Sequence, residues 1–218
     1  MPDMQPWTYS HLDGFETCPR QFHAKYVLKK FPWTPTAATK WGDEVHKAFE
    51  SRIRDGVELP ASMQQWSKLV DQFANLPGTK LIEKKLAVDK NFQSCDYWES
   101  WSRGNVDLSV ICKSHGVLVD WKTGKYKPSE QLMLYAGYAF ANWPQLETVQ
   151  TGFVWLKDKK IDKRTYTRDD VPVIWQEFVP RVRRLELAYE GDKWPARPSG
   201  LCKGWCPVRD CEHWKEKP

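Results

Sequence analysis

Two aspartates and a lysine stand at the ends of two neighbouring apolar segments. Asp107 follows Arg103-Gly-Asn-Val, and thirteen residues later Asp120 and Lys122 close the segment Gly-Val-Leu-Val-Asp-Trp-Lys. Because side chains alternate along a strand, Asp120 and Lys122 would share one face while Trp121 points to the other. We expect Asp107, on the preceding strand of a hairpin, to reach the same side.

Two carboxylates and an ammonium group at the ends of buried strands predict a divalent-cation site that acts on phosphate. Burying such charges is costly unless they are paired or coordinate a metal. Mg²⁺ sites use one or two carboxylates together with water and substrate phosphates, and a lysine can stabilise charge on a phosphate. A surface salt bridge on a hairpin is the alternative interpretation, which the apolar context disfavours.

The composition is that of a folded protein. The chain has 218 residues with 33 basic and 28 acidic side chains, a net charge of +5, and 41% hydrophobic residues, which excludes a disordered chain. No apolar run reaches the ~18 residues of a membrane span, and the N-terminus lacks the basic and apolar regions of a signal peptide. We therefore expect a cytoplasmic protein whose six cysteines are not a disulfide framework.

The elements that must position the site alternate between helices and strands. Apolar periodicity predicts helices that begin at the N-cap Ser10 and near Cys18-Pro19, and others over residues 39–54, 60–76, 129–141 and 169–189. It predicts strands over 81–88, 105–112, 117–121, 149–156 and 165–167. This order favours an α/β protein with a small mixed central sheet flanked by helices, as one domain over residues 1–218.

Three of the six cysteines lie in the tail Gly191–Pro218, which is too small to build its own core. Three cysteines within ten residues predict a metal or cluster site, and a tetrahedral thiolate site needs four sulfurs. The candidate ligands are Cys202, Cys206 and Cys211 with Cys18 as the fourth, and zinc with His213 or Cys18 as the fourth ligand stays open.

Five sequence blocks, in this order, resemble a known nuclease family. They are Tyr-Ser-His-Leu-Asp-Gly-Phe-Glu-Thr-Cys-Pro-Arg-Gln-Phe, Trp-Gly-Asp-Glu-Val-His-Lys-Ala-Phe-Glu, Gly-Asn-Val-Asp-Leu-Ser-Val, Val-Asp-Trp-Lys-Thr-Gly-Lys and Gln-Leu-Met-Leu-Tyr-Ala. Together they resemble the RecB-like branch of the PD-(D/E)XK nuclease superfamily. The resemblance implies a restriction-endonuclease-like core and metal-dependent hydrolysis of DNA phosphodiester bonds in a phage or prokaryotic setting.

The resemblance also implies roles for individual residues. The implied metal ligands are His46, Asp107, Asp120 and the backbone carbonyl of Trp121. The implied catalytic group is Asp107, Asp120, Lys122, Glu83, Gln131 and Tyr135, of which Lys122 is the catalytic lysine and the last two match the family's Gln-x-x-x-Tyr. Because imidazole suits transition metals, the cofactor would be Mg²⁺ or Mn²⁺.

One subset of the same branch carries a [4Fe–4S] cluster on one N-terminal and three C-terminal cysteines. The resemblance implies such a cluster on Cys18, Cys202, Cys206 and Cys211, where it would staple the tail to the N-terminal helix. The tail departs from the subset's spacing, Cys-x2-Cys-x5-Cys, since it reads Cys-x3-Cys-x4-Cys. This departure keeps Zn²⁺ as the alternative.

Candidate DNA contacts follow from charge and aromatic content. They are the basic residues Lys157, Lys159, Lys160, Lys163 and Arg164, and the aromatic residues Trp98 and Trp101. A solvated face and ordinary core packing are the respective alternatives.

The predicted function is a DNA exonuclease that acts on single strands or DNA ends in recombination or repair. Its partners would be DNA and a recombination or replication protein, with no membrane. The alternatives are a catalytically inactive nucleic-acid-binding module and a structural or interaction protein built on a zinc site. The presence of Asp107, Asp120 and Lys122 argues against an inactive module.

Overall fold

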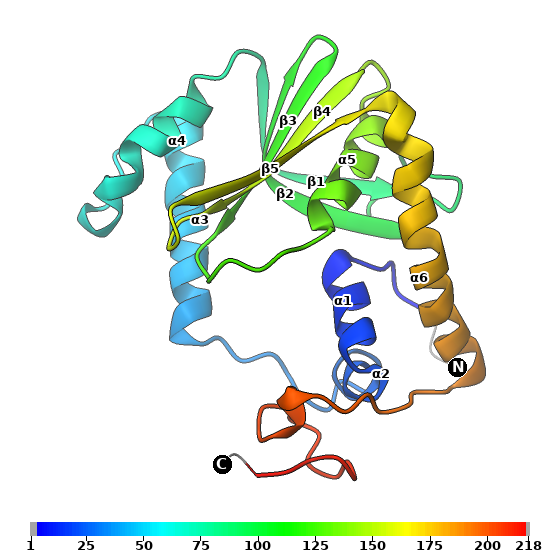
Figure 1. Cartoon of the computed structure of the whole chain (residues 1–218). Helices are drawn as coiled ribbons and strands as arrows, with labels where there is room; N and C mark the ends of the chain where they lie inside the picture. Colours follow the sequence, from blue (N-terminus) through cyan, green and yellow to red (C-terminus); the bar gives the residue numbers. More distant parts are fainter. Residues whose placement is uncertain (1–3, 217–218) are drawn as a thin grey trace. The chain divides into compact units, whose positions relative to one another are not determined.

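The computed structural model describes residues 4–216 (Figure 1). The first three residues of the N-terminal segment considered for a signal peptide lie outside this range. No helix formed by the described residues has the length and apolar character needed to cross a membrane. The chain divides into two compact units, one over Pro35–Trp175 and the other formed by the residues up to Thr34 together with those from Gln176 onward. A single nuclease domain therefore stays a prediction.

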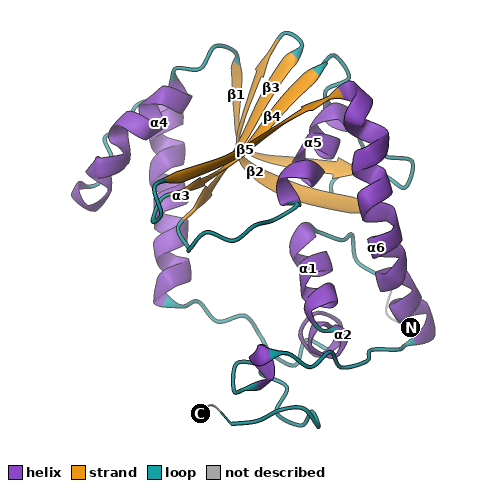
Figure 2. Ribbon diagram, viewed as in Figure 1, coloured by secondary structure: helices purple, strands orange, loops and turns teal. Residues whose placement is uncertain are grey.

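The unit over Pro35–Trp175 contains a five-stranded sheet in the order β1-β2-β3-β4-β5 (Figure 2). The strands are β1 (Thr79–Val88), β2 (Ser102–Cys112), β3 (His115–Lys122), β4 (Thr148–Trp155) and β5 (Lys160–Thr167). β3 and β4 run parallel and the other neighbours run antiparallel, which makes the sheet mixed. The predicted fold class, an α/β protein with a small mixed sheet flanked by helices, is confirmed.

Three segments of this unit form helices beside the sheet. They are α3 (Ala37–Asp55), α4 (Ser67–Ala74), which a 3₁₀ turn over Ala61–Trp66 precedes, and α5 (Gln131–Asn142). α5 is the crossover that a parallel pair of strands requires, here between β3 and β4. α3 begins at a capping box on Thr36 and ends at Gly56, whose φ of 70° suits glycine at a helix end.

The core of this unit lies between the sheet and the pair α3 and α4. Val45 and Phe49 of α3 pack against strand residues that include Leu108, Val119 and Trp121. Arg52 of α3 also forms a two-bond ion pair with Asp71 of α4, at 2.8 and 2.9 Å. The predicted apolar stripe of α3 thus fixes the helix against the strands that carry the candidate site.

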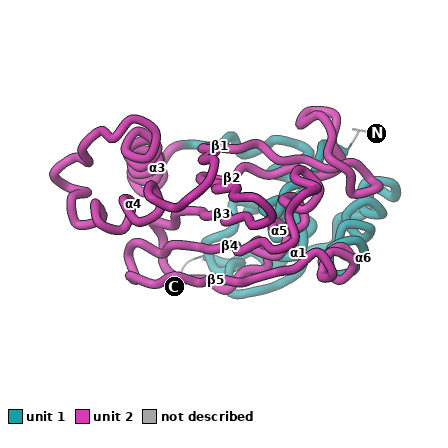
Figure 3. Tube along the Cα trace, turned by 90° about the horizontal axis from the view of Figure 1, so that it is seen from above, with its two compact units in different colours: residues 1–34, 176–218 teal, residues 35–175 magenta. Residues whose placement is uncertain are grey.

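The other unit contains the N-terminal helices and the C-terminal part of the chain (Figure 3). Its elements are α1 (Tyr9–Thr17), α2 (Pro19–Phe22), the π-helix η1 (His23–Val27), the 3₁₀ turn η4 (Gly200–Cys202) and most of α6 (Val171–Gly191), which begins in the sheet-containing unit. An ion pair between Arg181 of α6 and Glu16 of α1, at 2.6 Å, fixes these helices to each other.

Two local predictions differ from the structure. The N-cap of α1 is Thr8 and not Ser10, because Thr8 has extended backbone and its hydroxyl accepts from His11 N at 3.2 Å. The basic run was expected to precede a short strand over 165–167, but β5 already begins at Lys160. As the last strand of the sheet, β5 has one neighbour and exposes most of its side chains, so charged residues are tolerated there.

Candidate active site

The candidate site lies where β2 and β3 diverge. Their pairing ends at Leu108 and Val119, so Asp107 and Asp120 are the first residues beyond it. In place of a backbone partner, the Trp121 N–H donates to Asp107 Oδ2 at 2.6 Å. Both carboxylates are buried, with 8% of Asp107 and 5% of Asp120 exposed. The fork therefore presents two acidic groups in a protected position.

β2 changes face at this fork. Leu108 and Val110 pack in the core beside α3, whereas Ser102 bonds to Tyr138 of α5 and a Cβ on Gly104 would meet the same ring at 3.0 Å. In a regular strand these four even-numbered residues would share one face. The strand therefore turns about its own axis near Asp107, and simple alternation does not extend through the site.

Glu83 on β1 lies opposite this turn in a conformation that is unusual for its residue type. Its φ of 49° is left-handed, and the β1–β2 pairing is interrupted between Ile82–Leu108 and Lys84–Val106. Such a conformation in a residue with a Cβ stores strain of about 1–3 kcal/mol and is concentrated at functional sites. The Glu83 carboxylate also accepts a hydrogen bond from the Asn105 side-chain amide.

Three possible metal ligands gather here from three elements. One ligand atom each of His46, Glu83 and Asp107 lies within 4.8 Å of the other two. His46 comes from the middle of α3, with Nδ1 3.5 Å from Asp107 Oδ1, and its Nε2 donates to the Trp121 carbonyl oxygen at 3.0 Å. Two carboxylates and an imidazole suit Mn²⁺ and Mg²⁺.

The electrostatics of the site also fit a cation. Burial and the Asp120 charge raise the pKa of Asp107 to about 6, against the opposing effect of His46. Burial lowers the pKa of His46, but the hydrogen bond and charge of Asp107, the charge of Asp120 and the Trp121 carbonyl outweigh it and raise this pKa to about 9. The two carboxylates thus favour a positive charge beside them, and a divalent cation would supply it.

Cation binding at this site should therefore release protons. Because His46 is protonated below about pH 9, its coordination of Mn²⁺ must displace a proton, and the affinity should rise about tenfold per pH unit between about pH 6, above which Asp107 is ionised, and that pH. Calorimetry in buffers of different ionisation enthalpy measures the protons released. His46→Asn should bind Mn²⁺ more weakly and release about one proton fewer. Equal proton release by both proteins would contradict the assignment of His46.

Asp120 is held by two side chains, Lys122 and Tyr135, and a third side chain, Gln131, supports Tyr135. Lys122 Nζ lies 2.7 Å from its Oδ2, and the Tyr135 hydroxyl donates to its Oδ1 at 2.8 Å. Gln131, one helical turn earlier, donates to the Tyr135 oxygen at 2.7 Å. Burial, and then the Asp120 charge, raise the pKa of Tyr135 well above its ordinary value, so the hydroxyl keeps its proton. The Lys122 ammonium also lies 4.6 Å from the centre of the Phe153 ring.

The structure gathers all the predicted catalytic residues but divides them into two groups. Glu83 joins His46 and Asp107 in the possible ligand group, and Asp120 is bonded to Lys122 and Tyr135 instead. Sequence reasoning missed Asn105, which donates to Glu83 and whose carbonyl oxygen lies 3.0 Å from the Tyr135 hydroxyl. No sequence pattern marked Asn105, because the turn of β2 near Asp107 interrupts the alternation from which its position could have been inferred.

The two candidate tryptophans differ in environment. Trp98 is 66% exposed, with Lys85 Nζ 5.2 Å and the Arg103 guanidinium 5.1 Å from its ring centre. Trp101 packs beside Phe92 and Trp175 at ring distances of 5.9 and 6.5 Å. Only Trp98 presents an open aromatic face with cations beside it.

The five basic residues proposed to contact DNA lie in β5 and in the turn before it, at different distances from the site. Trp155 of β4 pairs with Lys122 on one side and Lys160 on the other, so Lys160 lies two strands away from Lys122. Lys157 and Lys159 lie in the turn that leads into Lys160. The remaining two, Lys163 and Arg164, pair with Gly152 and Thr151 farther along β4. Lys157, Lys159 and Lys160 are therefore nearest to the site along the sheet.

The four cysteines predicted as ligands all belong to the unit that contains α1. N–H groups donate to three of their sulfurs: the Arg197 backbone to Cys18 at 3.4 Å, the Gln21 side chain to Cys206 at 3.3 Å and the Ser199 backbone to Cys202 at 3.5 Å. Within residues 4–216, no three cysteine sulfurs lie within 4.8 Å of one another. A closed zinc site, with sulfurs roughly 3.8 Å apart, is therefore not assembled there.

The mixed sheet carries carboxylates, a histidine and a lysine at the β2–β3 fork, and a comparison with known families identifies this arrangement. The family model of the PD-(D/E)XK nuclease superfamily matches residues 6–211, so the chain belongs to this superfamily. The superfamily predicted from the sequence blocks is thereby confirmed. Nucleases of this superfamily use divalent metals, in agreement with the ligand group above.

Solved structures show the same fold at low sequence identity. The chain is similar to a "Putative exonuclease" from Eubacterium rectale with a TM-score of 0.56 and 12% identity, over 97% of this chain and 89% of that one. It is also similar to SSO0001, with a TM-score of 0.50 and 12% identity, over 97% of this chain and 88% of that one. No curated protein sequence matches the chain significantly.

Proposed function

We propose that this protein is a metal-dependent deoxyribonuclease that degrades DNA from its ends. The observation that carries the proposal is the pair of buried carboxylates, Asp107 and Asp120, beside His46 and Lys122 at the β2–β3 fork. The name of the E. rectale neighbour supports an exonuclease over an endonuclease. The favoured substrates are single-stranded DNA and DNA ends.

The side chains of the site would divide the work of hydrolysis. His46, Glu83 and Asp107 would hold the cation together with Asp120 and the Trp121 carbonyl. A divalent cation at such a site lowers the pKa of water and offsets charge on the phosphate. Lys122 would stabilise the negative charge that develops on the phosphate as water attacks it, because its ammonium is already oriented by Asp120. Tyr135 would keep Asp120 in place as a hydrogen-bond donor.

The test is cleavage by anaerobically purified protein with Mn²⁺. The substrates are linear single strands labelled at either end and a circular single strand of the same composition. Loss of the linear strands alone would establish an exonuclease, and the order of label release would give its polarity. Cleavage of the circle would establish an endonuclease, and cleavage of neither would overturn the proposal in favour of a binding module.

The branch and the biological setting are also part of this proposal. The sequence blocks that surround His46 and Gln131 support the RecB-like branch. Such an enzyme would act in DNA recombination or repair in the cytoplasm of a prokaryotic or phage-infected cell. A recombination or replication protein would be its partner there.

Trp98 should contribute to the binding of single-stranded DNA. A base can stack on its exposed face while Lys85 and Arg103 contact phosphates, so Trp98→Ala should weaken binding about tenfold and leave Mn²⁺ affinity unchanged. Fluorescence anisotropy with a short labelled strand in EDTA measures this effect. Trp101→Ala should lower stability more than affinity, because its ring packs on Phe92 and Trp175. Unchanged affinity in Trp98→Ala would remove Trp98 from the DNA-binding surface.

We also propose a [4Fe–4S] cluster on the four cysteines of the α1-containing unit. Hydrogen bonds to sulfur favour a thiolate and tune iron–sulfur centres, and donors to Cys18, Cys202 and Cys206 are in place. Gln21 and Arg197 also link the N-terminal helices to the C-terminal segment through these sulfurs. The cluster would have a structural role.

Loss of one ligand should remove this cluster. Cys202→Ala should lose iron and visible absorbance and lower the Tm by about 10 °C, because cluster binding is coupled to folding of the tail. Cys95→Ala, a matched change in the other unit, should keep both properties. Wild-type protein with one zinc and no iron would instead support the zinc alternative.

A further inference from the structure

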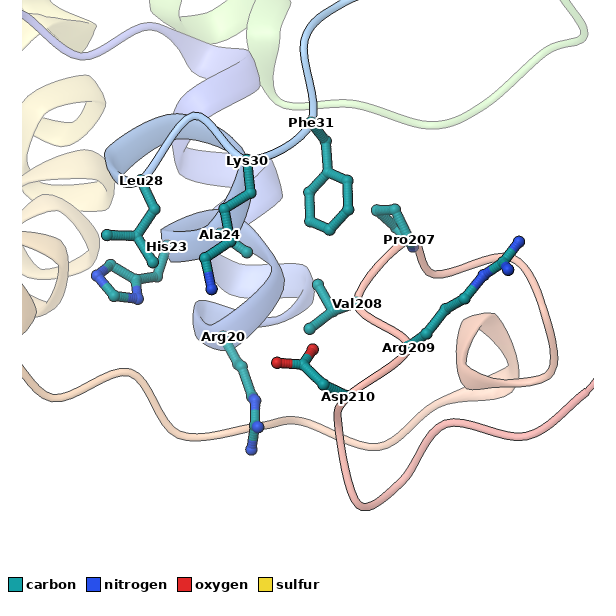
Figure 4. Close-up of a pocket in the computed structure, with 10 residues that line it drawn as sticks. All are labelled: Arg20, His23, Ala24, Leu28, Lys30, Phe31, Pro207, Val208, Arg209 and Asp210. Carbon is teal, nitrogen blue, oxygen red and sulfur yellow. The ribbon is translucent and has the colours of Figure 1, made fainter.

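A cavity of about 850 Å³ lies in the α1-containing unit, and no residue of the candidate active site lines it. Arg20 of α2, Lys30 and Phe31 line it from the N-terminal side, and Val208, Arg209 and Asp210 line it from the C-terminal segment (Figure 4). Its volume is within the range of small-molecule and nucleotide sites. Three cationic side chains and one carboxylate give it a net positive charge.

The backbone of the N-terminal wall is held in a defined, partly strained conformation. The π-helix His23–Val27 ends with Leu28 N–H donating to His23 O at 2.8 Å, and Lys30 N–H donates to Ala24 O at 2.9 Å. Between them, Lys29 has a left-handed φ of 50°. π-helical turns and strained residues are frequent at functional sites. Lys30 and Phe31 follow this turn and both line the cavity, with the Phe31 ring on the side of Pro207 and Val208 and the Lys30 side chain beside Ala24 (Figure 4).

The cations of the cavity differ in their availability. Arg20 Nη1 is paired with Glu212 at 2.5 Å, and the Arg209 guanidinium lies 5.9 Å from the centre of the Trp214 ring. For Lys30, no carboxylate of residues 4–216 lies within ion-pair distance. The Lys30 ammonium is therefore the group most ready to bind an incoming anion.

The segment that forms this wall is basic, aromatic and exposed. Residues 25–34 read Lys-Tyr-Val-Leu-Lys-Lys-Phe-Pro-Trp-Thr, with three lysines and no acidic residue. Leu28 is 47% exposed and Trp33 is 70% exposed, so large apolar groups remain in water beside the cations. Aromatic rings interleaved with lysines are typical of surfaces that bind single-stranded nucleic acid, because unpaired bases stack on rings while phosphates bind ammonium groups.

We propose that this cavity and residues 28–33 bind nucleotides of a single DNA strand. A base would stack on Phe31, and the adjoining phosphate would bind Lys30. A duplex cannot enter this arrangement, since its bases are stacked on each other. The inference rests on the proposed nuclease function for the choice of DNA, but it assigns a second contact surface outside the catalytic unit.

The test measures binding without divalent cation, so no cleavage is required. Full-length protein is titrated against a labelled 20-nucleotide single strand, a duplex of the same sequence and a free mononucleotide as competitor. Phe31→Ala should weaken single-strand binding about tenfold, with little change for the duplex. Lys30→Gln should lower the slope of log affinity against log salt by about 0.7, the value for one phosphate contact on a single strand.

Two matched variants in the same unit serve as controls. Leu187→Ala removes an exposed apolar side chain of α6, and Lys193→Gln removes an exposed lysine away from the cavity. Both should bind like the wild type. Unchanged single-strand affinity in Phe31→Ala and Lys30→Gln would overturn the inference. An equal loss of affinity for the duplex would also overturn it, and so would a loss of affinity for the free mononucleotide alone.

The outcome is separable from that of the proposed nuclease function. With Mn²⁺, Phe31→Ala should raise the KM for a long single strand and keep the wild-type kcat, because Phe31 belongs to the unit that contains none of the proposed catalytic side chains. A protein that binds through Phe31 but cleaves nothing would disprove the nuclease and keep the inference. A wild-type protein that cleaves DNA, together with a Phe31→Ala variant that binds single strands normally, would keep the nuclease and disprove the inference.

Discussion

Lys122→Ala abolishes cleavage, with an expected loss of at least about 1000-fold in kcat at saturating Mn²⁺. The ammonium is held 2.7 Å from Asp120 Oδ2 at the buried end of β3. Its loss removes the positive charge that would stabilise the phosphate as water attacks it. The expected result is measured by single-turnover cleavage of a labelled linear strand.

Two further measurements separate chemistry from folding in this variant. The Tm of Lys122→Ala should stay near that of the wild type, and its Mn²⁺ affinity should not fall, because Lys122 is not a proposed ligand. Lys40→Ala, an exposed lysine on α3, is the matched control and should cleave normally. Cleavage by Lys122→Ala at the wild-type rate would disprove the proposed mechanism.

Trp121→Ala should cause the largest loss of stability, about 3–5 kcal/mol in the free energy of unfolding. The side chain is 3% exposed and lies edge-on to Phe49 and Phe73, each at 5.1 Å between ring centres. Because Phe49 is on α3 three residues after His46, the same packing positions the candidate ligand. Equilibrium unfolding in urea measures the loss.

Trp98→Ala is the matched control for this prediction. It removes the same side chain from an exposed position and should cost less than about 1 kcal/mol, the energy of its cation–π contacts. Trp121→Phe keeps an aromatic ring in the core and should fold even if Trp121→Ala does not. Equal losses in Trp121→Ala and Trp98→Ala would contradict the core role of Trp121.

The parts of the fold that could be predicted from sequence have local patterns. The stripe of Val45 and Phe49 repeats at helical spacing, and the apolar runs after Asp107 and before Asp120 are short and are joined by turn residues. These patterns depend on neighbours within one or two turns. They predicted α3, β2 and β3, and with them the opposite directions of Asp120 and Trp121.

The division of the site into two groups could not be predicted in this way. It depends on the left-handed backbone of Glu83, which no glycine marks, and on the turn of β2 near Asp107. It also depends on Tyr135, which reaches Asp120 from the following helix. Each of these contacts joins residues that are fifteen or more positions apart or sets a conformation against local propensity, so sequence periodicity does not contain it.

The position of β5 at the edge of the sheet has a consequence for solubility. An edge strand offers unpaired backbone groups to a second molecule, and charged side chains hinder such strand addition. Lys160, Lys163 and Arg164 lie along this edge together with Ile161, which is 50% exposed. Variants that neutralise these charges to reduce DNA binding would also remove a barrier to edge-to-edge aggregation. The basic side chains of β5, which we propose to contact DNA, would thus also hinder the addition of further strands to the sheet.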